Sequence, residues 1–203
     1  MSTNALGALL VAIAYVSGSV PYGLILTRLF LGVDVRTVGS GNIGGTNVAR
    51  VNKKLGVATI VLDILKAVIP LLVAKRLLAG REHGDLWVMG VAVAAFVGHC
   101  YTVFLRFKGG KGVASGFGIY LVLAPPLALI GVAIWAITAL TLRMSSLGSL
   151  LGTLTFVVGM IVIRGIGDPL TWSSLAVGAI IFWKHRENIR RIVSGEERKK
   201  MKV

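Results

Sequence analysis

Residues 39–50 read GSGNIGGTNVAR, a polar, glycine-rich stretch that separates two long apolar segments, Ala5 to Phe30 and Leu55 to Leu78. Glycine reaches left-handed backbone conformations without a Cβ clash, so this stretch can fold back and point consecutive N–H groups into one concavity. Such a concavity suits a phosphate, and the planar cation of Arg50 can bind two phosphate oxygens at once. The sequence therefore predicts a phosphate-binding loop between two membrane spans. The alternative is a Gly/Asn-rich connector that only turns the chain.

The composition places the chain in a membrane. Of its 203 residues, 55% are hydrophobic and 15% are charged, which is more apolar and less charged than an ordinary soluble domain. The formal net charge is +14, but the cations lie mainly between apolar segments, which favours an anionic membrane face or substrate over nucleic acid. The single cysteine, Cys100, excludes an internal disulfide and a thiolate metal site. We expect one integral membrane domain spanning residues 1–203.

The apolar segments predict an all-α polytopic membrane protein with seven transmembrane helices. The predicted spans are Ala5–Phe30, Leu55–Leu78, Leu86–Leu105, Val113–Ala124, Leu127–Leu142, Leu147–Ile163 and Pro169–Trp183. Pro125 and Pro126 interrupt the region 113–142, which makes either two short crossings or a re-entrant hairpin. No Lys or Arg precedes the first segment, so we expect it to be retained and not cleaved as a signal peptide.

The positions of the cations predict the orientation. Of the 22 Lys and Arg residues, those on the proposed outer side are Lys75, Arg76, Arg81 and Arg164. Lys66 lies within a span, and the rest lie on the inner side. The cations after the last span include Arg198, Lys199, Lys200 and Lys202. By the positive-inside rule, the N-terminus is outside and the C-terminus is cytoplasmic.

Two ionisable residues within predicted spans need partners. Asp63 and Lys66 are three positions apart, so they share a helix face and can pair. A buried pair is a functional candidate, although we favour a structural pairing near the loop. His99 lies close to the end of its span, where a satisfied core histidine is the favoured interpretation.

Two further basic segments lie on the same predicted side as residues 39–50. Residues 106–112 read RFKGGKG, whose cations and glycines suit an anion, although a basic turn that obeys the positive-inside rule is the alternative. Residues 185–191 read HRENIRR, in which His185 and Asn188 share a face if the last helix continues past Trp183. Such a pair can orient a hydroxyl or act as a base, although a solvated, lipid-touching helix end is equally favoured. We expect these segments and Ser17-Gly18-Ser19 to converge on one face.

Several chemistries are disfavoured by what the sequence lacks. The acidic residues on the inner side are too scattered to predict a Mg²⁺ site: Asp34, Glu187, Glu196 and Glu197. Neither a Gly-x-Ser-x-Gly elbow nor a His-x-x-x-x-Asp acyltransferase box is present, so we expect no covalent acyl-enzyme. An already activated donor would need mainly positioning and charge neutralisation from the protein.

Three segments resemble the signature segments of the bacterial acyl-phosphate:glycerol-3-phosphate acyltransferases, the PlsY family. They are GSGNIGGTN at 39–47 with Arg50, FKGGKGVA at 107–114 and KHRENIRR at 184–191. The resemblance covers nearly the whole chain. It departs at Gly45, Thr102 and Ser115, where members usually carry Ala, Pro and Thr.

The resemblance implies a multi-pass enzyme of the bacterial inner membrane whose active site faces the cytoplasm. It would transfer a fatty acyl group from acyl-phosphate to the sn-1 hydroxyl of glycerol-3-phosphate, giving lysophosphatidic acid and phosphate in the first step of phospholipid synthesis. Membrane lipid and the two substrates would be its partners, with no cofactor, metal or nucleic acid. Acyl-chain preference and oligomeric state stay open.

The resemblance also assigns site residues by position. The catalytic candidates are Ser40, Arg50, Lys111, His185 and Asn188. The candidates for substrate and phosphate binding are Gly39, Gly41, Asn42, Gly44, Thr46, Asn47, Lys108, Gly109, Gly110 and Ser146. Either His185 or a substrate phosphate would take the hydroxyl proton.

Two other functions were weighed against acyl transfer. A small transporter for phosphorylated solutes would use the basic loops as a vestibule, but it predicts matching outer features or an internal repeat, which the sequence does not show. A non-catalytic lipid-binding scaffold accounts for the basic tail, but not for the Asn, Ser and Thr content of residues 39–50.

Overall fold

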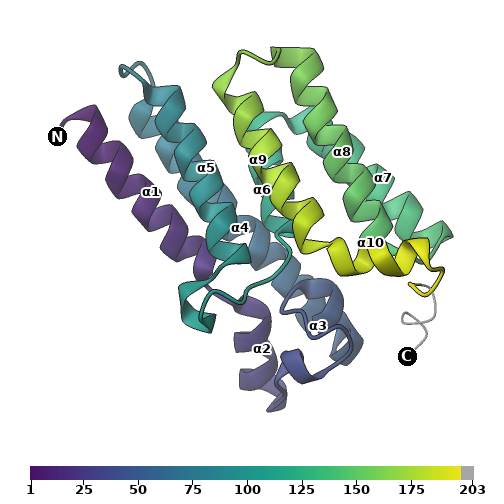
Figure 1. The fold of residues 1–203 in the computed structure, drawn as a ribbon. Helices are drawn as coiled ribbons and strands as arrows, with labels where there is room; N and C mark the ends of the chain where they lie inside the picture. Colours follow the sequence, from purple (N-terminus) through teal and green to yellow (C-terminus); the bar gives the residue numbers. More distant parts are fainter. Residues whose placement is uncertain (198–203) are drawn as a thin grey trace.

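The computed structural model describes residues 1–197, and in that part of the chain all regular structure is helical (Figure 1). The α-helices are α1 (Thr3–Ser19), α2 (Tyr22–Leu31), α3 (Gly45–Val51), α4 (Lys53–Leu78), α5 (Gly84–Cys100), α6 (Val113–Leu123), α7 (Pro125–Thr141), α8 (Ser145–Arg164), α9 (Pro169–Lys184) and α10 (Arg186–Val193). Two short 3-10 helices are η1 (Val35–Thr37) and η2 (Val103–Leu105). The predicted cations Arg198, Lys199, Lys200 and Lys202 lie outside the described residues.

Within residues 1–197, four helical segments are long and apolar enough to cross a membrane. They are Thr3–Leu31, Lys53–Leu78, Gly84–Leu105 and Ser145–Arg164. Val113–Leu123 and Pro125–Thr141 are shorter apolar helices. The predicted all-α architecture is therefore confirmed, whereas seven crossings and the orientation of the termini stay predictions.

Proline and capping residues move several predicted boundaries. The first predicted span is two helices, because the chain leaves α1 at Ser19 and re-enters a helix at Tyr22, after Pro21. The segment Gly84–Leu105 covers the third predicted span, but as two helices, since α5 ends at Cys100 and the Thr102 hydroxyl then accepts the Phe104 N–H to start η2. The predicted interruption between α6 and α7 is confirmed at Ala124.

The helices form two packed groups. In one group, α1, α4 and α5 contact each other, and the fully buried side chains of Ala14, Ala92 and Ala95 let backbones approach closely. In the other group, α7 runs beside α8 and α8 packs on α9 (Figure 1). Helix α6 contacts members of both groups. The two groups also meet directly, where α5 packs on α9.

A small second core supports the first polar loop. Val35, Ile43 and Val48 are buried together with Leu24 of α2. Burying each such side chain contributes about 1.5–3 kcal/mol relative to exposure in water. This cluster fixes residues 32–52 against the first turn of α2, so the loop has a defined shape.

Candidate active site

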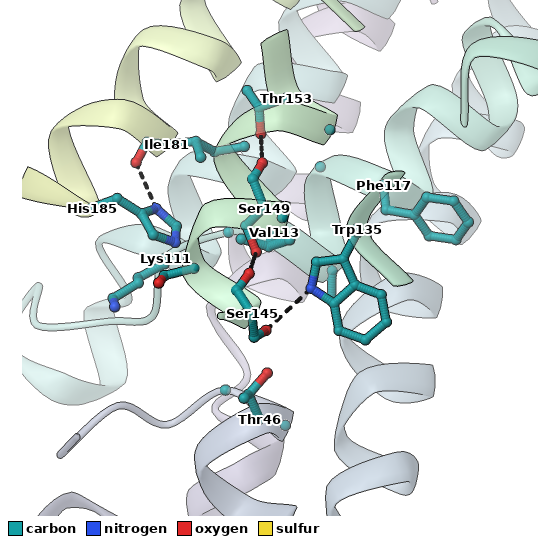
Figure 2. A pocket seen from close by; sticks show the side chains of 18 of the residues that line it. Thr46, Lys111, Val113, Phe117, Trp135, Ser145, Ser149, Thr153, Ile181 and His185 are labelled. Carbon is teal, nitrogen blue, oxygen red and sulfur yellow. Dashed lines mark hydrogen bonds between the residues drawn. The ribbon is translucent and has the colours of Figure 1, made fainter. Parts of the chain in front are cut away.

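A cavity of about 260 Å³ is lined by residues of α3, the start of α8 and α10, among others, and Figure 2 shows part of its lining. Its walls come from all three basic segments identified in the sequence. The predicted site residues that line it are Ser40, Asn42, Gly44, Thr46, Asn47, Arg50, Lys111, Ser146, His185 and Asn188. The structure thus brings Arg50 and Lys111, which are far apart in the sequence, to one cavity.

The remaining predicted residues do not line the cavity. They are Gly39, Gly41, Lys108, Gly109 and Gly110, together with Ser17-Gly18-Ser19. Lys108 is exposed, and Gly39 and Gly41 adopt left-handed conformations that shape the first loop. The Ser17 hydroxyl donates to the Lys66 carbonyl at 3.0 Å, so the serine patch joins α1 to α4 outside the cavity, and its position on the same membrane face stays a prediction.

Asn47 holds the first loop in shape. Its amide nitrogen donates to three backbone carbonyls, those of Val35 at 3.1 Å and of Val38 and Asn42 at 2.9 Å. Its side-chain oxygen accepts the Ser40 N–H at 3.0 Å. Because these bonds occupy the amide, we assign Asn47 to the loop and not to the predicted direct phosphate contact.

The outer rim of the cavity is polar and carries a cation. Ser40, Thr46 and Arg50 are exposed, and Figure 2 shows Thr46 below the start of α8. Asn42 accepts the Gly44 N–H at 2.9 Å, which closes the turn into α3. This rim offers hydroxyl donors and a guanidinium to an incoming anion.

A chain of hydrogen bonds crosses the opposite wall. The Lys111 ammonium donates to the side-chain oxygen of Asn188, whose amide nitrogen donates to Glu197 Oε1 at 2.7 Å. Ser146 donates to the same oxygen at 2.6 Å, and Arg191 Nε donates to Glu197 Oε2 at 2.6 Å. Burial raises the pKa of Glu197, but these hydrogen bonds outweigh it and lower the pKa overall. The carboxylate therefore stays charged and orients Asn188.

Glu197 is a site residue that sequence reasoning missed. It counted only as one of the scattered acids, because nothing in its spacing indicates where the tail turns. Gly195, which has a φ of +72° after the end of α10, was the available signal. A glycine there turns the chain back, and the backbone N–H of Glu197 then bonds to the Arg191 carbonyl at 3.1 Å.

His185 lies at the junction between α9 and α10, so the helix does not continue unbroken from Trp183 to Asn188, which was the condition for their predicted shared face. Its Nδ1 lies 2.8 Å from the Ile181 carbonyl (Figure 2). A carbonyl can only accept, so Nδ1 carries the proton and Nε2 is left as an acceptor. Burial first, and then the Lys111 cation, lower the pKa of His185 to about 4. The ring is neutral at pH 7.

The inner part of the cavity is apolar. The hydroxyls of Ser149 and Thr153 donate to carbonyls four residues earlier, at 2.9 and 2.7 Å, so they are satisfied within α8. The rings of Tyr120 and Phe156 stack with centroids 4.2 Å apart. Other apolar lining residues are Ile60, Ile64, Val113, Phe117, Val132, Trp135 and Ile181. Within the cavity, a polar region that carries cations therefore adjoins an apolar region.

The predicted Asp63–Lys66 pair is confirmed, with Lys66 Nζ 2.8 Å from Asp63 Oδ1. Asp63 and the buried His99 both line the cavity. Their closest contact, from His99 Nδ1 to Asp63 Oδ1, is 3.6 Å, slightly beyond hydrogen-bond distance. Among residues 1–197, no group of three or more His, Cys, Asp or Glu side chains is placed to hold a metal ion.

Comparisons with known proteins identify the family of the chain. Residues 8–195 match the family model described as glycerol-3-phosphate acyltransferase. The chain is 57% identical to the glycerol-3-phosphate acyltransferase of Anaeromyxobacter sp. (strain K), over 98% of this chain and 100% of that protein. It is 44% identical to the enzyme of that name from Aliarcobacter butzleri (strain RM4018), over 92% and 93% of the two chains.

Two crystal structures share the fold. Both are of PlsY (YgiH), an integral membrane glycerol 3-phosphate acyltransferase. The glycerol 3-phosphate form has a TM-score of 0.86 and 38% identity, covering 94% of each chain. The lysophosphatidic acid form has a TM-score of 0.83 and 37% identity, covering 94% of this chain and 93% of the other. The chain therefore belongs to the glycerol-3-phosphate acyltransferase (PlsY) family of integral membrane enzymes.

Proposed function

We propose that this enzyme transfers a fatty acyl group from acyl-phosphate to the sn-1 hydroxyl of glycerol-3-phosphate. The observation that carries the proposal is the cavity itself, whose cationic end adjoins an apolar arm between α6, α7 and α8. An acyl-phosphate has the same division, with an anionic head and an oily tail. The second substrate would bring another phosphate to the cationic end, and the glycerol 3-phosphate and lysophosphatidic acid forms of the similar PlsY structures support this choice of acceptor and product.

Such a site must bind two negatively charged substrates next to each other. Two phosphorylated substrates repel each other, and Arg50 and Lys111 lie on the walls of the cavity that would hold both. We assign these two cations to the substrate phosphates because they line the same cavity from different segments of the chain, whereas Arg191 pairs with Glu197. They would offset the repulsion and stabilise the departing phosphate.

The reaction needs no bond between enzyme and acyl group. The glycerol-3-phosphate hydroxyl oxygen forms a bond to the acyl carbonyl carbon, and the bond from that carbon to the phosphate oxygen breaks. The bonding pair leaves with the phosphate, and the hydroxyl proton must reach an acceptor. Because acyl-phosphate is already activated, the residues around the cavity need only align the two substrates and neutralise charge.

His185 suits the role of orienting the hydroxyl better than that of general base. Its Nε2 can accept a hydrogen bond, but a pKa of about 4 makes the ring a weak base at pH 7. A phosphate group, with a second pKa of about 6, binds the proton more strongly. We therefore assign the proton to a substrate phosphate, and the hydrogen bond from the hydroxyl to His185.

The membrane arrangement belongs to the same proposal. Residues 1–203 would form one domain of the bacterial inner membrane, crossing it seven times with the N-terminus outside. The segments from α6 to α7 would make two short crossings, because α7 packs along α8 and both short helices are apolar. The cavity would then face the cytoplasm, on the side where most cations lie.

The test is an assay of the purified protein in detergent with palmitoyl-phosphate and glycerol-3-phosphate. We expect stoichiometric release of phosphate and 1-palmitoyl lysophosphatidic acid, and no product from palmitoyl-CoA. Product from palmitoyl-CoA alone would disprove the proposed donor, and a 2-acyl product would disprove the proposed position. Binding of both substrates without product would instead favour a transporter or a lipid-binding scaffold.

A further inference from the structure

Both ends of the loop that carries Lys111, residues 101–112, lie beside one buried residue, Asp63. On one side, His99 in the last turn of α5 contacts the Asp63 carboxylate at 3.6 Å. On the other side, the hydroxyl of Ser115 in the first turn of α6 donates to the Asp63 carbonyl at 2.9 Å. The two helix ends that define the span of the loop therefore meet on α4.

Near its end, the loop bonds back to His99 and Cys100 through two glycines. The Gly110 N–H donates to the His99 carbonyl at 3.0 Å, and the Gly109 N–H donates to the Cys100 carbonyl at 3.2 Å. A Cβ atom at Gly110 would collide with His99 Nε2, so only glycine allows this close approach. Lys111 follows Gly110 directly, so the position of the His99 ring determines the position of the Lys111 backbone.

Asp63 is itself held in place. Its carboxylate pairs with Lys66 at 2.8 Å, and the exposed fractions of the two side chains are 3% and 1%. Lys66 also donates to the Val20 carbonyl, just after α1, at 2.9 Å. Because a broken pair would leave a charge buried without compensation, the carboxylate has one favoured position.

We propose that Asp63, through His99 and Ser115, is a positioning residue for Lys111. This inference rests on the proposed function, in which Lys111 binds substrate phosphate. A misplacement of about 1 Å in a catalytic group can cost about 100-fold in rate. The buried cluster keeps Lys111 at the distance that Asn188 and the phosphates require, although none of its members needs to touch the substrate.

The test is a double-mutant cycle that combines His99→Leu or Ser115→Ala with Lys111→Ala. With Lys111 present, we expect each anchor variant to lower kcat/KM for glycerol-3-phosphate about tenfold or more. In the Lys111→Ala background, we expect a change of less than about twofold. Ser115→Thr, which keeps the hydroxyl, should restore activity. Equal losses in both backgrounds, or no loss in either, would overturn the proposal.

Two controls separate positioning from loss of fold. Thr171→Val removes another buried hydroxyl, which donates to the Met160 carbonyl at a distance of 3.4 Å. Thr171 does not line the cavity, so this variant should leave kcat/KM unchanged. If His99→Leu does not accumulate as folded protein, the kcat/KM values of the Ser115 variants test the proposal without it. If the wild-type protein transfers no acyl group, the proposed function fails. In that case the same double-mutant cycle is measured with the affinity for inorganic phosphate, determined by calorimetry, in place of kcat/KM. An affinity loss only when Lys111 is present supports the proposal, and equal losses in both backgrounds or no loss in either overturn it.

Discussion

At the scale of single residues, the two lysines of one loop have different surroundings. Lys111 lines the cavity and donates to Asn188, whereas Lys108 is exposed and outside it. We expect Lys111→Ala to lower kcat by about 100- to 1,000-fold, the usual cost of removing one donor to a developing anion. Lys108→Ala should change kcat by less than about threefold. Similar losses for both variants in a phosphate-release assay would show that general surface charge, and not the placement of Lys111, drives the reaction.

His185 gives a prediction about pH. Its pKa in the folded chain, about 4, is below the ordinary value of 6.5, so the folded chain binds fewer protons than the unfolded chain between those values. Its contribution to stability is therefore complete above pH 6.5 and is lost as the pH falls toward 4. We expect ¹⁵N NMR of histidine-labelled protein to show a neutral ring with a protonated Nδ1 from pH 6 to 8. The His185→Asn spectrum would assign the signal, and a titration near 6.5 would contradict this account.

The presence of an anion site in the loops could be predicted from the sequence, but the role of each residue in that site could not. Glycines, amides and cations in short segments indicate an anion site whichever residue makes the contact. Asn47 shows why the roles stay open, since its bonds to Val35 and Val38 depend on how the loop closes. Glu197 was missed because its partners come from α8 and α10, which only the folded chain brings together.

At the scale of helices, α8 gives the cavity its apolar arm. Ser149 faces the cavity, while Thr155 does not line it, although both hydroxyls bond to the carbonyl four residues earlier. We expect Ser149→Leu to fill the arm and displace at least two methylenes of a long chain. At about 0.8 kcal/mol per methylene, this lowers kcat/KM for palmitoyl-phosphate about tenfold.

The matched controls for that variant are Thr155→Leu and a shorter donor. Thr155→Leu adds the same side chain outside the cavity and should leave the chain-length profile unchanged. With Ser149→Leu, octanoyl-phosphate should react nearly as well as with the wild type, and KM for glycerol-3-phosphate should not change. Equal losses for both donors would mean that the acyl chain lies elsewhere.

Helix existence was easier to predict than helix ends. Apolar runs such as 147–163 are long enough that composition alone identifies them, and α8 covers that run. Helix ends depend on single capping interactions. Thr102 starts η2, after α5 has ended at Cys100, by accepting the Phe104 N–H, and Pro21 separates α1 from α2. Hydropathy detects neither boundary.

At the scale of the whole molecule, the arrangement in the membrane is testable by labelling. In a Cys100→Ala background, we expect a cysteine at Arg143 to react with an impermeant maleimide only from the cytoplasmic side of inverted vesicles. A cysteine at Glu82 should react only from the opposite side, because the few outer cations include Arg81 nearby. Labelling of both positions from one side would contradict the proposed seven crossings.

The central claim is that one cavity, with Arg50 and Lys111 on its walls, holds the phosphates of both substrates. The most direct measurement is a structure of this protein with glycerol-3-phosphate and a non-transferable acyl-phosphonate bound together. We predict both anionic groups in contact with Arg50 or Lys111, and the acyl chain beside Ser149 and Phe156. Glycerol-3-phosphate bound away from this cavity, with Arg50 and Lys111 making no contact to either ligand, would contradict the account.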